Sequence, residues 1–245
     1  MKAGNAAYDD VDLALYGGRD PRELPRYTYP EAARATNVPP TTIAAWVRGQ
    51  TYARKHGRGF FKPVIRRPDP SDTRLSFNNL LEIHALRALR EYHNVKLESV
   101  RRALSLAEKQ FDIPRLLISS QLRTSGGALF LDSYFQLVEL APAVQHSIRS
   151  VLKQYLNRIR FEDAPAFFPI PRIPQNRDRE VVLVSPLIAF GRPIIGRRGI
   201  STEAIAERVN AGEDKSLVME DYGLREDEFD EALAYESAFA QSPAA

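Results

Sequence analysis

The chain has 245 residues, 44% hydrophobic and 27% charged, which is the composition of an ordinary globular protein with one large or two to three small domains. It contains no cysteine, so disulfides and thiolate metal sites are excluded. Its formal net charge of +3 is small, and its longest charge-free apolar stretch, residues 181–190, is too short for a membrane span. Because the first residues carry acids where a signal peptide needs an apolar run, we expect a cytoplasmic protein.

The small net charge conceals a strong separation of charge along the chain. Residues 26–67 hold nine Lys or Arg and one acid, whereas residues 200–245 hold three bases and twelve acids. The basic window favours a polyanion such as nucleic acid as its partner, and the acidic end favours a different partner. The alternative is that both stretches are solvated surfaces.

The first strong helical pattern begins at Tyr29, after a polar segment expected to form an arm or short turns. Pro30 suits the first turn of one helix, and Asn37 marks the turn that follows it. A second helix is predicted to open at residues 39–41 with a threonine as its cap, and Gly49 ends it. Its buried stripe is predicted at helical spacing: Ile43, Trp46 and Val47.

A β-hairpin is predicted next, from residues 52–55 and 60–65, turning about His56-Gly57-Arg58-Gly59. Two helices with apolar residues at helical spacing follow, over residues 77–92 and 96–111. The order helix, helix, hairpin is that of a winged helix-turn-helix.

From about residue 115 the sequence pattern no longer predicts consecutive helices. Residues 115–122 and 128–134 flank a Thr-Ser-Gly-Gly turn signal and predict a second β-hairpin, and an amphipathic helix is predicted over residues 143–160. Residues 164–180 hold four prolines in ten positions and are interpreted as an extended linker. Beyond it, two short strand candidates at 181–184 and 187–190 precede three predicted helices, at 201–211, 214–222 and 225–238.

The predicted fold class is therefore mainly α with small β elements (α+β). We divide the chain into five parts: an N-terminal arm (1–26), a winged helix-turn-helix DNA-binding domain (27–112), a hairpin and helix that are candidates for dimerisation (113–163), the Pro-rich linker (164–180) and a C-terminal three-helix, homeodomain-like bundle (181–240).

The second predicted helix carries the strongest site signal. A helix that opens with short polar side chains can lie in the major groove and bring its first turn to base edges. Thr41 and Thr42 can hydrogen-bond bases, Ala44 or Ala45 can contact a thymine methyl, and Arg48 can reach a phosphate or guanine. The predicted wing tip adds basic groups suited to phosphate or minor-groove contact: Lys55, His56 and Arg58.

A glycine-spaced loop near the C-terminus holds three arginines: Arg192, Arg197 and Arg198. Guanidinium forks presented from such a loop can pair bidentately with carboxylates of a protein partner, which makes them candidate partner-binding residues. The alternative, that they pair with the local acids, is equally open.

Enzymatic function has no positive support. The four histidines are not spaced as metal ligands, and no nucleophile elbow or phosphate-binding glycine motif is present. We expect no enzyme, no metal and no cofactor.

Residues 27–110 resemble MerR-like winged helix-turn-helix domains. The likeness rests on YTYPEAARATNVPPTTIAAWVRG, then a basic wing, then LSFNNLLEIHALRALREYHNVKLESVRRAL. That family often has an arginine directly after the Thr-Leu/Ile of its second helix, where this chain has Ala44. Phosphate anchoring must then come from Arg48, the wing or Arg34.

Residues 191–236 resemble a small helical, antitoxin-associated family known as a domain of unknown function (the 433 family), through GRPIIGRR, AERVNAGED and DYGLREDEFDEALAYE. Arg197 replaces a threonine of the usual signature, and one residue is added around Gly199. The two domains in this order are similar to VapB-type antitoxins.

That resemblance implies a PIN-type ribonuclease toxin as protein partner, neutralised by direct binding, and autorepression of the operon through operator DNA. A homodimer is expected, because one helix-turn-helix reads too few bases for operator specificity. The alternative function is a MerR-like transcriptional regulator that senses a small molecule through residues 115–165.

Overall fold

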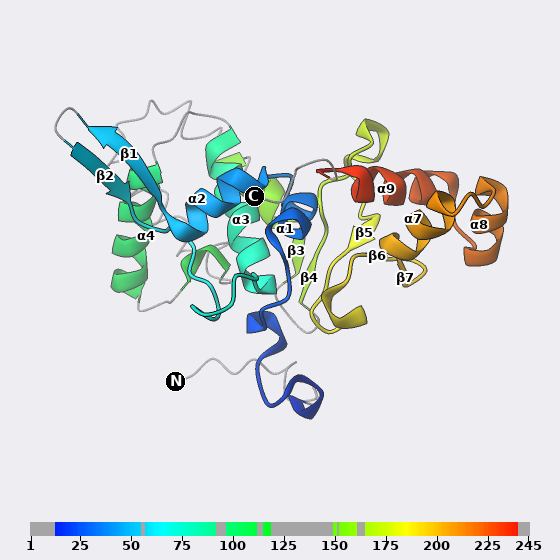
Figure 1. The fold of residues 1–245 in the computed structure, drawn as a ribbon, viewed down its shortest axis with the longest axis horizontal. Helices are drawn as coiled ribbons and strands as arrows, with labels where there is room; N and C mark the ends of the chain where they lie inside the picture. The colour runs from blue at the N-terminus through cyan, green and yellow to red at the C-terminus, as the bar shows by residue number, and fades with distance from the viewer. Residues whose placement is uncertain are drawn as a thin grey trace.

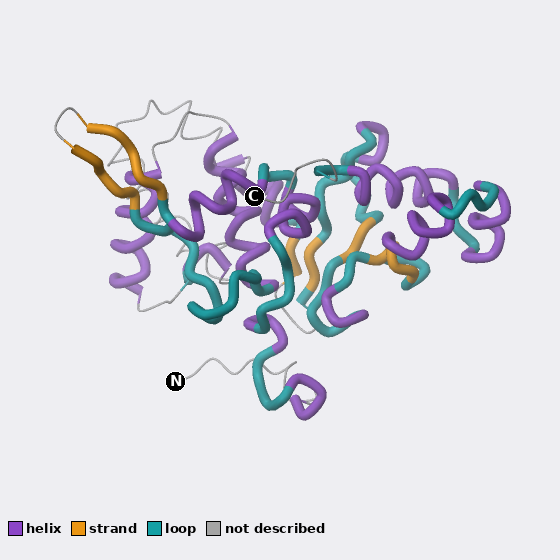
Figure 2. The backbone as a smooth tube through the Cα atoms, in the orientation of Figure 1, coloured by secondary structure: helices purple, strands orange, loops and turns teal. Residues whose placement is uncertain are grey.

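The structure is a computed structural model that describes residues 13–54, 57–91, 97–111, 115–118, 149–150, 152–160 and 165–239. It is mainly helical with small antiparallel sheets, as predicted. Figure 1 shows the helices of the N-terminal half and the β1–β2 hairpin at one end of the molecule, with the three C-terminal helices at the other. Figure 2 shows that the strands form small, separate groups, with the β1–β2 hairpin projecting at one end.

Helix α1 (Tyr29–Thr36) begins at a capping box in which Thr28 and Glu31 satisfy each other's backbone N–H groups, and it ends at Asn37 in a left-handed conformation. Helix α2 (Pro40–Arg48) ends at Gly49, as predicted. The predicted threonine cap of α2 is wrong. Pro39 occupies the cap position and makes no side-chain bond, because its ring has no atom that can accept one.

Strands β1 (Gln50–Arg54) and β2 (Gly57–Phe61) pair antiparallel, with Arg54 opposite Gly57. The connection is therefore two residues long, and the predicted turn about residues 56–59 is wrong, since Gly57 to Gly59 lie in β2. The predicted second strand also ends earlier, at Phe61. The backbone N–H groups of Val64 and Ile65 instead donate to the carbonyl of Trp46, at 2.8 and 3.1 Å.

Helices α3 (Phe77–Glu91) and α4 (Leu97–Phe111) confirm the two predicted helices. Ser76 and Asn79 exchange backbone-to-side-chain hydrogen bonds of 3.1 and 3.2 Å at the start of α3. The larger of two hydrophobic cores is built around α1, α2 and α3. Its most deeply buried large side chains include Ile43, Ile65, Leu75, Phe77, Leu80, Ile83 and Leu86.

The middle region differs most from expectation. The predicted second hairpin lies almost wholly outside the described residues, and Leu116–Ile118 form a short 3-10 helix rather than a strand. The predicted helix over residues 143–160 is described only at 149–150 and 152–160. It ends by residue 156, and Ile159–Arg160 form strand β3, which pairs with β4 (Ala166–Phe167).

The Pro-rich segment, predicted as an extended linker, is buried over residues 165–169 and exposed over residues 177–180. From residue 165 it packs onto the larger core, where Phe167 is fully buried and exchanges two backbone hydrogen bonds, of 2.8 and 2.9 Å, with Val184. The prolines remove backbone donors, but the aromatic and aliphatic residues between them supply apolar surface that is more stable when buried.

The C-terminal unit combines three helices with a small sheet. The sequence pattern predicted the first of its three strands, within residues 181–184, but not the other two. Strands β5 (Val182–Leu183), β6 (Ile194–Ile195) and β7 (Ile200–Ser201) pair in that order. The predicted strand at 187–190 is wrong, because Ala189–Gly191 form a 3-10 turn. The three predicted helices are confirmed as α7 (Thr202–Asn210), α8 (Lys215–Tyr222) and α9 (Glu226–Ser237), which enclose the second core.

The two cores meet along a polar seam. Tyr27, before α1, donates a 2.9 Å hydrogen bond to the carbonyl of Gly191. Arg34 of α1 faces Glu236 of α9 at 3.7 Å, and the guanidinium of Arg172 donates to the carbonyl of Arg34 at 2.6 Å. Glu231 of α9 accepts backbone hydrogen bonds from Arg172 and Ile173. These contacts join α1, the Pro-rich segment and α9.

Candidate nucleic-acid interface

The burial of one face of α2 determines which residues its other face presents. Ile43, Trp46 and Val47 are each at most 4% exposed and face the core, as predicted. Of the predicted base-contacting residues, Thr41 in the first turn is exposed, whereas Thr42 and Ala45 are half-buried. The start of α2 thus offers a hydroxyl and small side chains to the surroundings, which are groups that can approach a base edge.

Arg48 lies at the opposite end of α2 and is exposed. Its guanidinium sits 5.0 Å from the centre of the Tyr29 ring, a cation–π arrangement that orients the side chain without neutralising its charge. Arg48 therefore remains able to pair with a phosphate.

The hairpin is attached directly to the end of α2 by Gly49. This residue has φ of +82°, and a Cβ there would lie 2.4 Å from the carbonyl oxygen of Phe61. Both facts require glycine, because a side chain would be strained and would collide with backbone. Of the predicted wing residues, Arg58 is exposed on β2, while Lys55 and His56 lie outside the described residues.

The basic residues of this region fall into two groups, those without and those with a carboxylate partner. Four exposed cations make no ion pair with a carboxylate of the described residues: Arg48, Arg58, Lys62 and Arg66. By contrast, Arg26 pairs with Glu31 at 3.2 Å, and the side chain of Arg34 is only 24% exposed beside Glu236. The structure therefore does not bring Arg34 together with the other predicted DNA-contacting residues.

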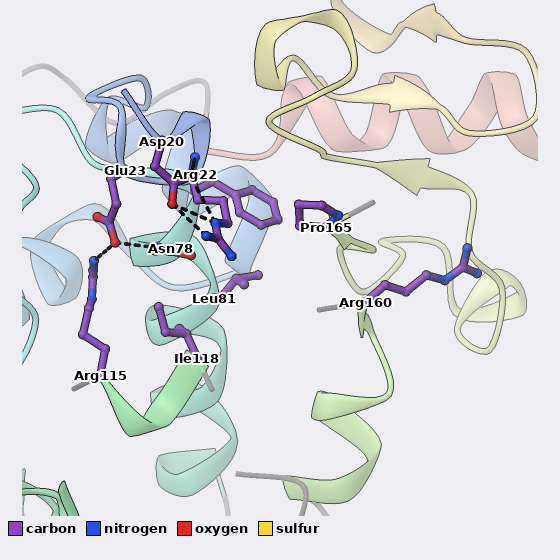
Figure 3. A pocket seen from close by; sticks show the side chains of 10 residues that line it. Asp20, Arg22, Glu23, Asn78, Leu81, Arg115, Ile118, Arg160 and Pro165 are labelled. Atoms are coloured by element: carbon purple, nitrogen blue, oxygen red, sulfur yellow. Dashed lines mark hydrogen bonds and ion pairs between the residues drawn. The ribbon is translucent and has the colours of Figure 1, made fainter. Parts of the chain in front are cut away.

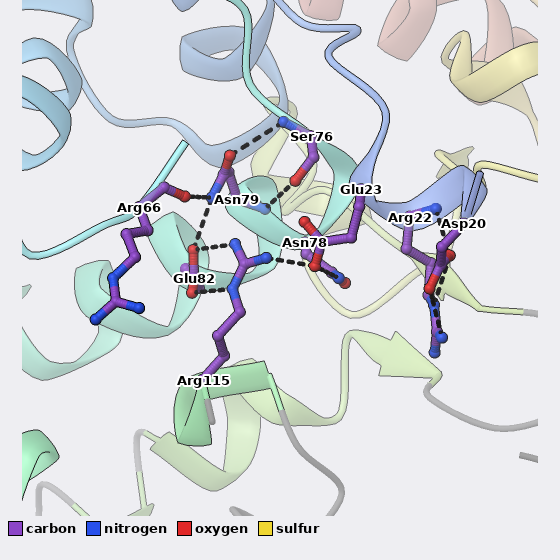
Figure 4. A network of polar contacts seen from close by, with 9 residues as sticks. All are labelled: Asp20, Arg22, Glu23, Arg66, Ser76, Asn78, Asn79, Glu82 and Arg115. Atoms are coloured by element: carbon purple, nitrogen blue, oxygen red, sulfur yellow. Dashed lines mark hydrogen bonds and ion pairs between the residues drawn. The ribbon is translucent and has the colours of Figure 1, made fainter. Parts of the chain in front are cut away.

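Lys62 and Arg66 belong to the basic window of the sequence but were not singled out as site residues. Their linear order does not distinguish them from Arg67, whose guanidinium donates to the carbonyl of Asp72 at 2.7 Å. Figure 4 shows why Arg66 differs: its carbonyl accepts a 2.8 Å bond from Asn79, while its guanidinium points away from the surrounding polar network.

That polar network is centred on a buried acid. Glu82 of α3 is 6% exposed and receives hydrogen bonds from Asn79 and from both Nε and Nη2 of Arg115 (Figure 4). Burial raises the pKa of Glu82, against the hydrogen bonds and the charge of Arg115, which lower it. The network fixes α3 against residues 115–118.

A neighbouring pocket of about 290 Å³ contains several charged groups, but they already have partners (Figure 3). Arg22 forms hydrogen bonds of 2.8 to 3.1 Å with both carboxylate oxygens of Asp20. Glu23 accepts from Asn78 and Arg115, and Arg160 pairs with Glu180 at 2.7 Å. None of the charged side chains that the structure describes around this pocket is consequently left unpaired for a ligand.

The three predicted partner-binding arginines have different surroundings. Arg197 donates from Nε and Nη2 to the two carboxylate oxygens of Glu228, at 2.7 and 2.6 Å, and to the carbonyl of Gly223 at 2.8 Å. Arg198 donates to the carbonyl of Tyr222 at 2.8 Å, and Arg192 is exposed on the seam side of the loop. For Arg197, the structure thus shows the local pairing that the sequence left as one of two alternatives.

His84 illustrates how a histidine can be purely structural. It is fully buried in α3, with Nε2 3.0 Å from the carbonyl oxygen of Tyr155. A carbonyl can only accept, so Nε2 carries the proton of a neutral ring. Burial, with smaller contributions from Arg87 and Arg158, lowers its pKa to about 3. Over the described ranges, no three His, Asp or Glu side chains gather closely enough to hold a metal ion.

Comparisons with known proteins match the C-terminal unit and most of the chain. Residues 182–235 match the family described as "Protein of unknown function (DUF433)", which confirms the resemblance carried by residues 191–236. The chain is 28% identical over 229 residues to "Putative antitoxin VapB45" of Mycobacterium tuberculosis, covering 86% of this chain and 93% of the relative.

The fold is similar to a crystal structure, that of Rv2018 from Mycobacterium tuberculosis. The TM-score is 0.60 at 25% identity, and the match covers 86% of this chain and 98% of that one. The resemblance to VapB-type antitoxins therefore extends over most of the chain, whereas the MerR-like assignment of residues 27–110 stays a prediction. None of the described helices is both long and apolar enough to cross a membrane.

Proposed function

We propose that this chain, similar over most of its length to a VapB-type antitoxin, is the antitoxin of a type II toxin–antitoxin pair. In this proposal it represses its own operon by binding operator DNA through α2 and the β1–β2 hairpin. It neutralises a PIN-type ribonuclease by direct binding through its C-terminal unit. Both activities are binding activities and require no catalytic residue.

The observation that carries the DNA-binding half is the group of exposed cations without carboxylate partners around α2 and the hairpin. Arg48 lies at the end of α2, Arg58 lies near the tip of the hairpin opposite Ala53, and Lys62 and Arg66 follow the hairpin toward α3. By contrast, Arg197 and Arg208 in the C-terminal unit are paired with acids. Cations left without internal partners favour a polyanionic ligand.

The DNA-binding half is tested by titrating a labelled duplex from the region upstream of the protein's own gene, at several salt concentrations. Each phosphate contact contributes about 0.9 to the slope of log affinity against log salt. Arg48→Ala and Arg58→Ala should therefore weaken binding and each reduce that slope by about 0.9. A DNA affinity that is unchanged by both substitutions and by the salt concentration would show that this surface does not bind DNA.

The toxin-binding half rests on the acidic C-terminal unit and its arginine loop. We assign Arg192, Arg197 and Arg198 to toxin binding, with Arg192 and the exposed part of Arg198 in direct contact. Arg197 holds the loop on α9 through Glu228. An arginine that reaches the acidic active site of a nuclease would compete electrostatically with its Mg²⁺.

Co-expression with the product of the adjacent gene, followed by purification, tests this half. A stable complex in which the chain suppresses ribonuclease activity is the expected result. Arg192→Ala should weaken the suppression while leaving operator binding intact. A neighbouring protein that is no nuclease, or that does not bind, would contradict the assignment. A homodimer on DNA remains part of the proposal, and light scattering of the free and DNA-bound protein would test it.

A further inference from the structure

Two adjacent aromatic residues of strand β2 have opposite surroundings. The ring of Phe61 stacks on Tyr52, with centroids 4.1 Å apart and planes inclined by 22°. Phe60, which pairs with Thr51 across the hairpin, projects from the other face and is 56% exposed, against 37% for Phe61. Phe61 therefore packs against another aromatic ring of the hairpin, whereas more than half of the Phe60 side chain is exposed.

The ring of Phe60 lies close to the backbone at the end of α2. A Cβ on Gly49 would lie 2.5 Å from Cζ and 3.0 Å from Cε2 of the Phe60 ring. The ring thus lies over Gly49, the residue that joins α2 to β1. One side of the ring is held by this backbone, and more than half of the side chain remains open to the surroundings.

The strand alternation places other accessible groups on the same face of the hairpin as Phe60. Residues two apart in a strand share a face, so Arg58 lies beside Phe60, and their cross-strand partners Ala53 and Thr51 are small and exposed. Arg48 precedes Gly49 at the end of α2. An exposed aromatic ring consequently shares a face with the cation Arg58 and lies over the residue that follows Arg48, and its described cross-strand neighbours on that face are small.

We propose that Phe60 is a DNA-contacting residue that packs its open ring face against deoxyribose and base surfaces of the duplex held by α2 and the hairpin. This inference rests on the proposed DNA binding and adds an apolar contact to it. The charges of this surface favour a polyanion as its ligand, because three of its cations have no carboxylate partner among the described residues: Arg48, Arg58 and Lys62. Duplex DNA combines that charge with apolar sugar and base surfaces, which a protruding aromatic side chain can contact.

Salt dependence separates an apolar contact from a phosphate contact. A phosphate contact releases counterions and changes the slope of log affinity against log salt, whereas an apolar contact changes the affinity equally at every salt concentration. We expect Phe60→Ala to weaken binding of the upstream duplex by roughly tenfold at all salt concentrations, with the slope unchanged. Arg58→Ala should instead reduce the slope by about 0.9.

Phe61→Ala is the matched control, because it removes the neighbouring ring that stacks on Tyr52. It should lower Tm more than Phe60→Ala and weaken DNA binding less. Phe60→Tyr, which keeps the ring, should bind almost as tightly as the wild type, and Phe60→Leu should fall between Tyr and Ala. Thermal unfolding of every variant shows whether a weaker binder is still folded.

Each result decides between the inference and its alternatives. If the wild type binds the duplex and Phe60→Ala binds equally well, the inference is wrong and the proposed function stands. If Phe60→Ala lowers the salt slope as Arg58→Ala does, Phe60 acts by positioning cations, and the apolar contact is refuted. If the wild type binds no duplex at any salt concentration, the proposed DNA binding fails and the inference with it.

Discussion

Arg115 holds the buried carboxylate of Glu82 with two hydrogen bonds of 2.9 Å, one from Nε and one from Nη2 (Figure 4). Removing one member of a buried ion pair leaves the other charge without compensation, at a cost of about 3–5 kcal/mol. Arg115→Leu should therefore lower the free energy of unfolding by that order, as measured by chemical denaturation. Because Glu82→Leu removes the stranded charge, adding it to Arg115→Leu should recover part of the loss. Equal stability of Arg115→Leu and wild type would contradict the role given to the pair.

The buried His84 makes stability depend on pH. Its pKa is lowered from 6.5 to about 3. Between these two pH values, the His84 imidazole is protonated in the unfolded chain and neutral in the folded chain. This group therefore destabilises the fold as pH falls below about 6.5, by up to about 1.4 kcal/mol for each pH unit, until the folded pKa is reached. His84→Gln, which cannot titrate, should show a flatter dependence between about pH 7 and about pH 5. Identical slopes for the two proteins would rule out His84 as the cause.

The seam between the two cores is testable at Tyr27. Its hydroxyl is buried and donates to Gly191, and burial raises the pKa of the phenol. Tyr27→Phe should lower the free energy of unfolding by about 1 kcal/mol, because the carbonyl of Gly191 loses its donor. Gly191→Ala should be more harmful, since the added Cβ would lie 2.4 Å from the hydroxyl oxygen at a residue with φ of +80°. A Gly191→Ala protein as stable as Tyr27→Phe would contradict this geometry.

Arg34 and Arg48 are both basic residues of the helix pair, and the structure predicts different phenotypes for them. Arg48→Ala should weaken operator binding and its salt dependence. Arg34→Ala should leave both nearly unchanged and lower Tm, because Arg34 faces Glu236 and not the exposed basic surface. Parallel DNA titrations and melting curves of the two variants check this. An equal loss of DNA affinity in both variants would show that Arg34 also contributes to DNA binding.

The arginine loop allows a similar separation. Arg197→Ala should lower Tm, because Glu228 is 5% exposed and loses both of its hydrogen bonds from the guanidinium. The guanidinium holds the pKa of Glu228 below its usual range, although burial acts in the opposite direction. Arg192→Ala should leave Tm unchanged and affect only neutralisation of the toxin. A ribonuclease assay with each purified variant, combined with melting curves, distinguishes a contact residue from a structural one.

Local signals in the sequence predicted the helices well. Prolines, glycines and apolar residues at helical spacing defined α1, α2, α3, α4 and the three C-terminal helices. These features act within one or two turns, so a single stretch of sequence contains them. The stripe of Ile43, Trp46 and Val47 also predicted correctly which face of α2 is buried, and hence that Thr41 and Arg48 are exposed.

Features that depend on distant partners were missed. Strands β6 and β7 are two residues long, and they are strands only because Ile194 and Ile195 pair with residues before and after them. The ion pairs that engage Arg34 and Arg197 join residues 202 and 31 positions apart, which no local pattern shows. The basic window marked the region of the candidate site, but only pairing shows which of its cations are available.

The burial of Phe167 has a practical consequence for dissecting the protein. Phe167 and Val184 are side chains of the larger core, although they follow the helix-turn-helix by many residues. A gene fragment truncated at the Pro-rich segment would deprive the N-terminal half of this apolar surface and expose the residues around His84. Independent expression of the DNA-binding half therefore has to extend through residue 184, a cut that removes β5 from the sheet of the C-terminal half.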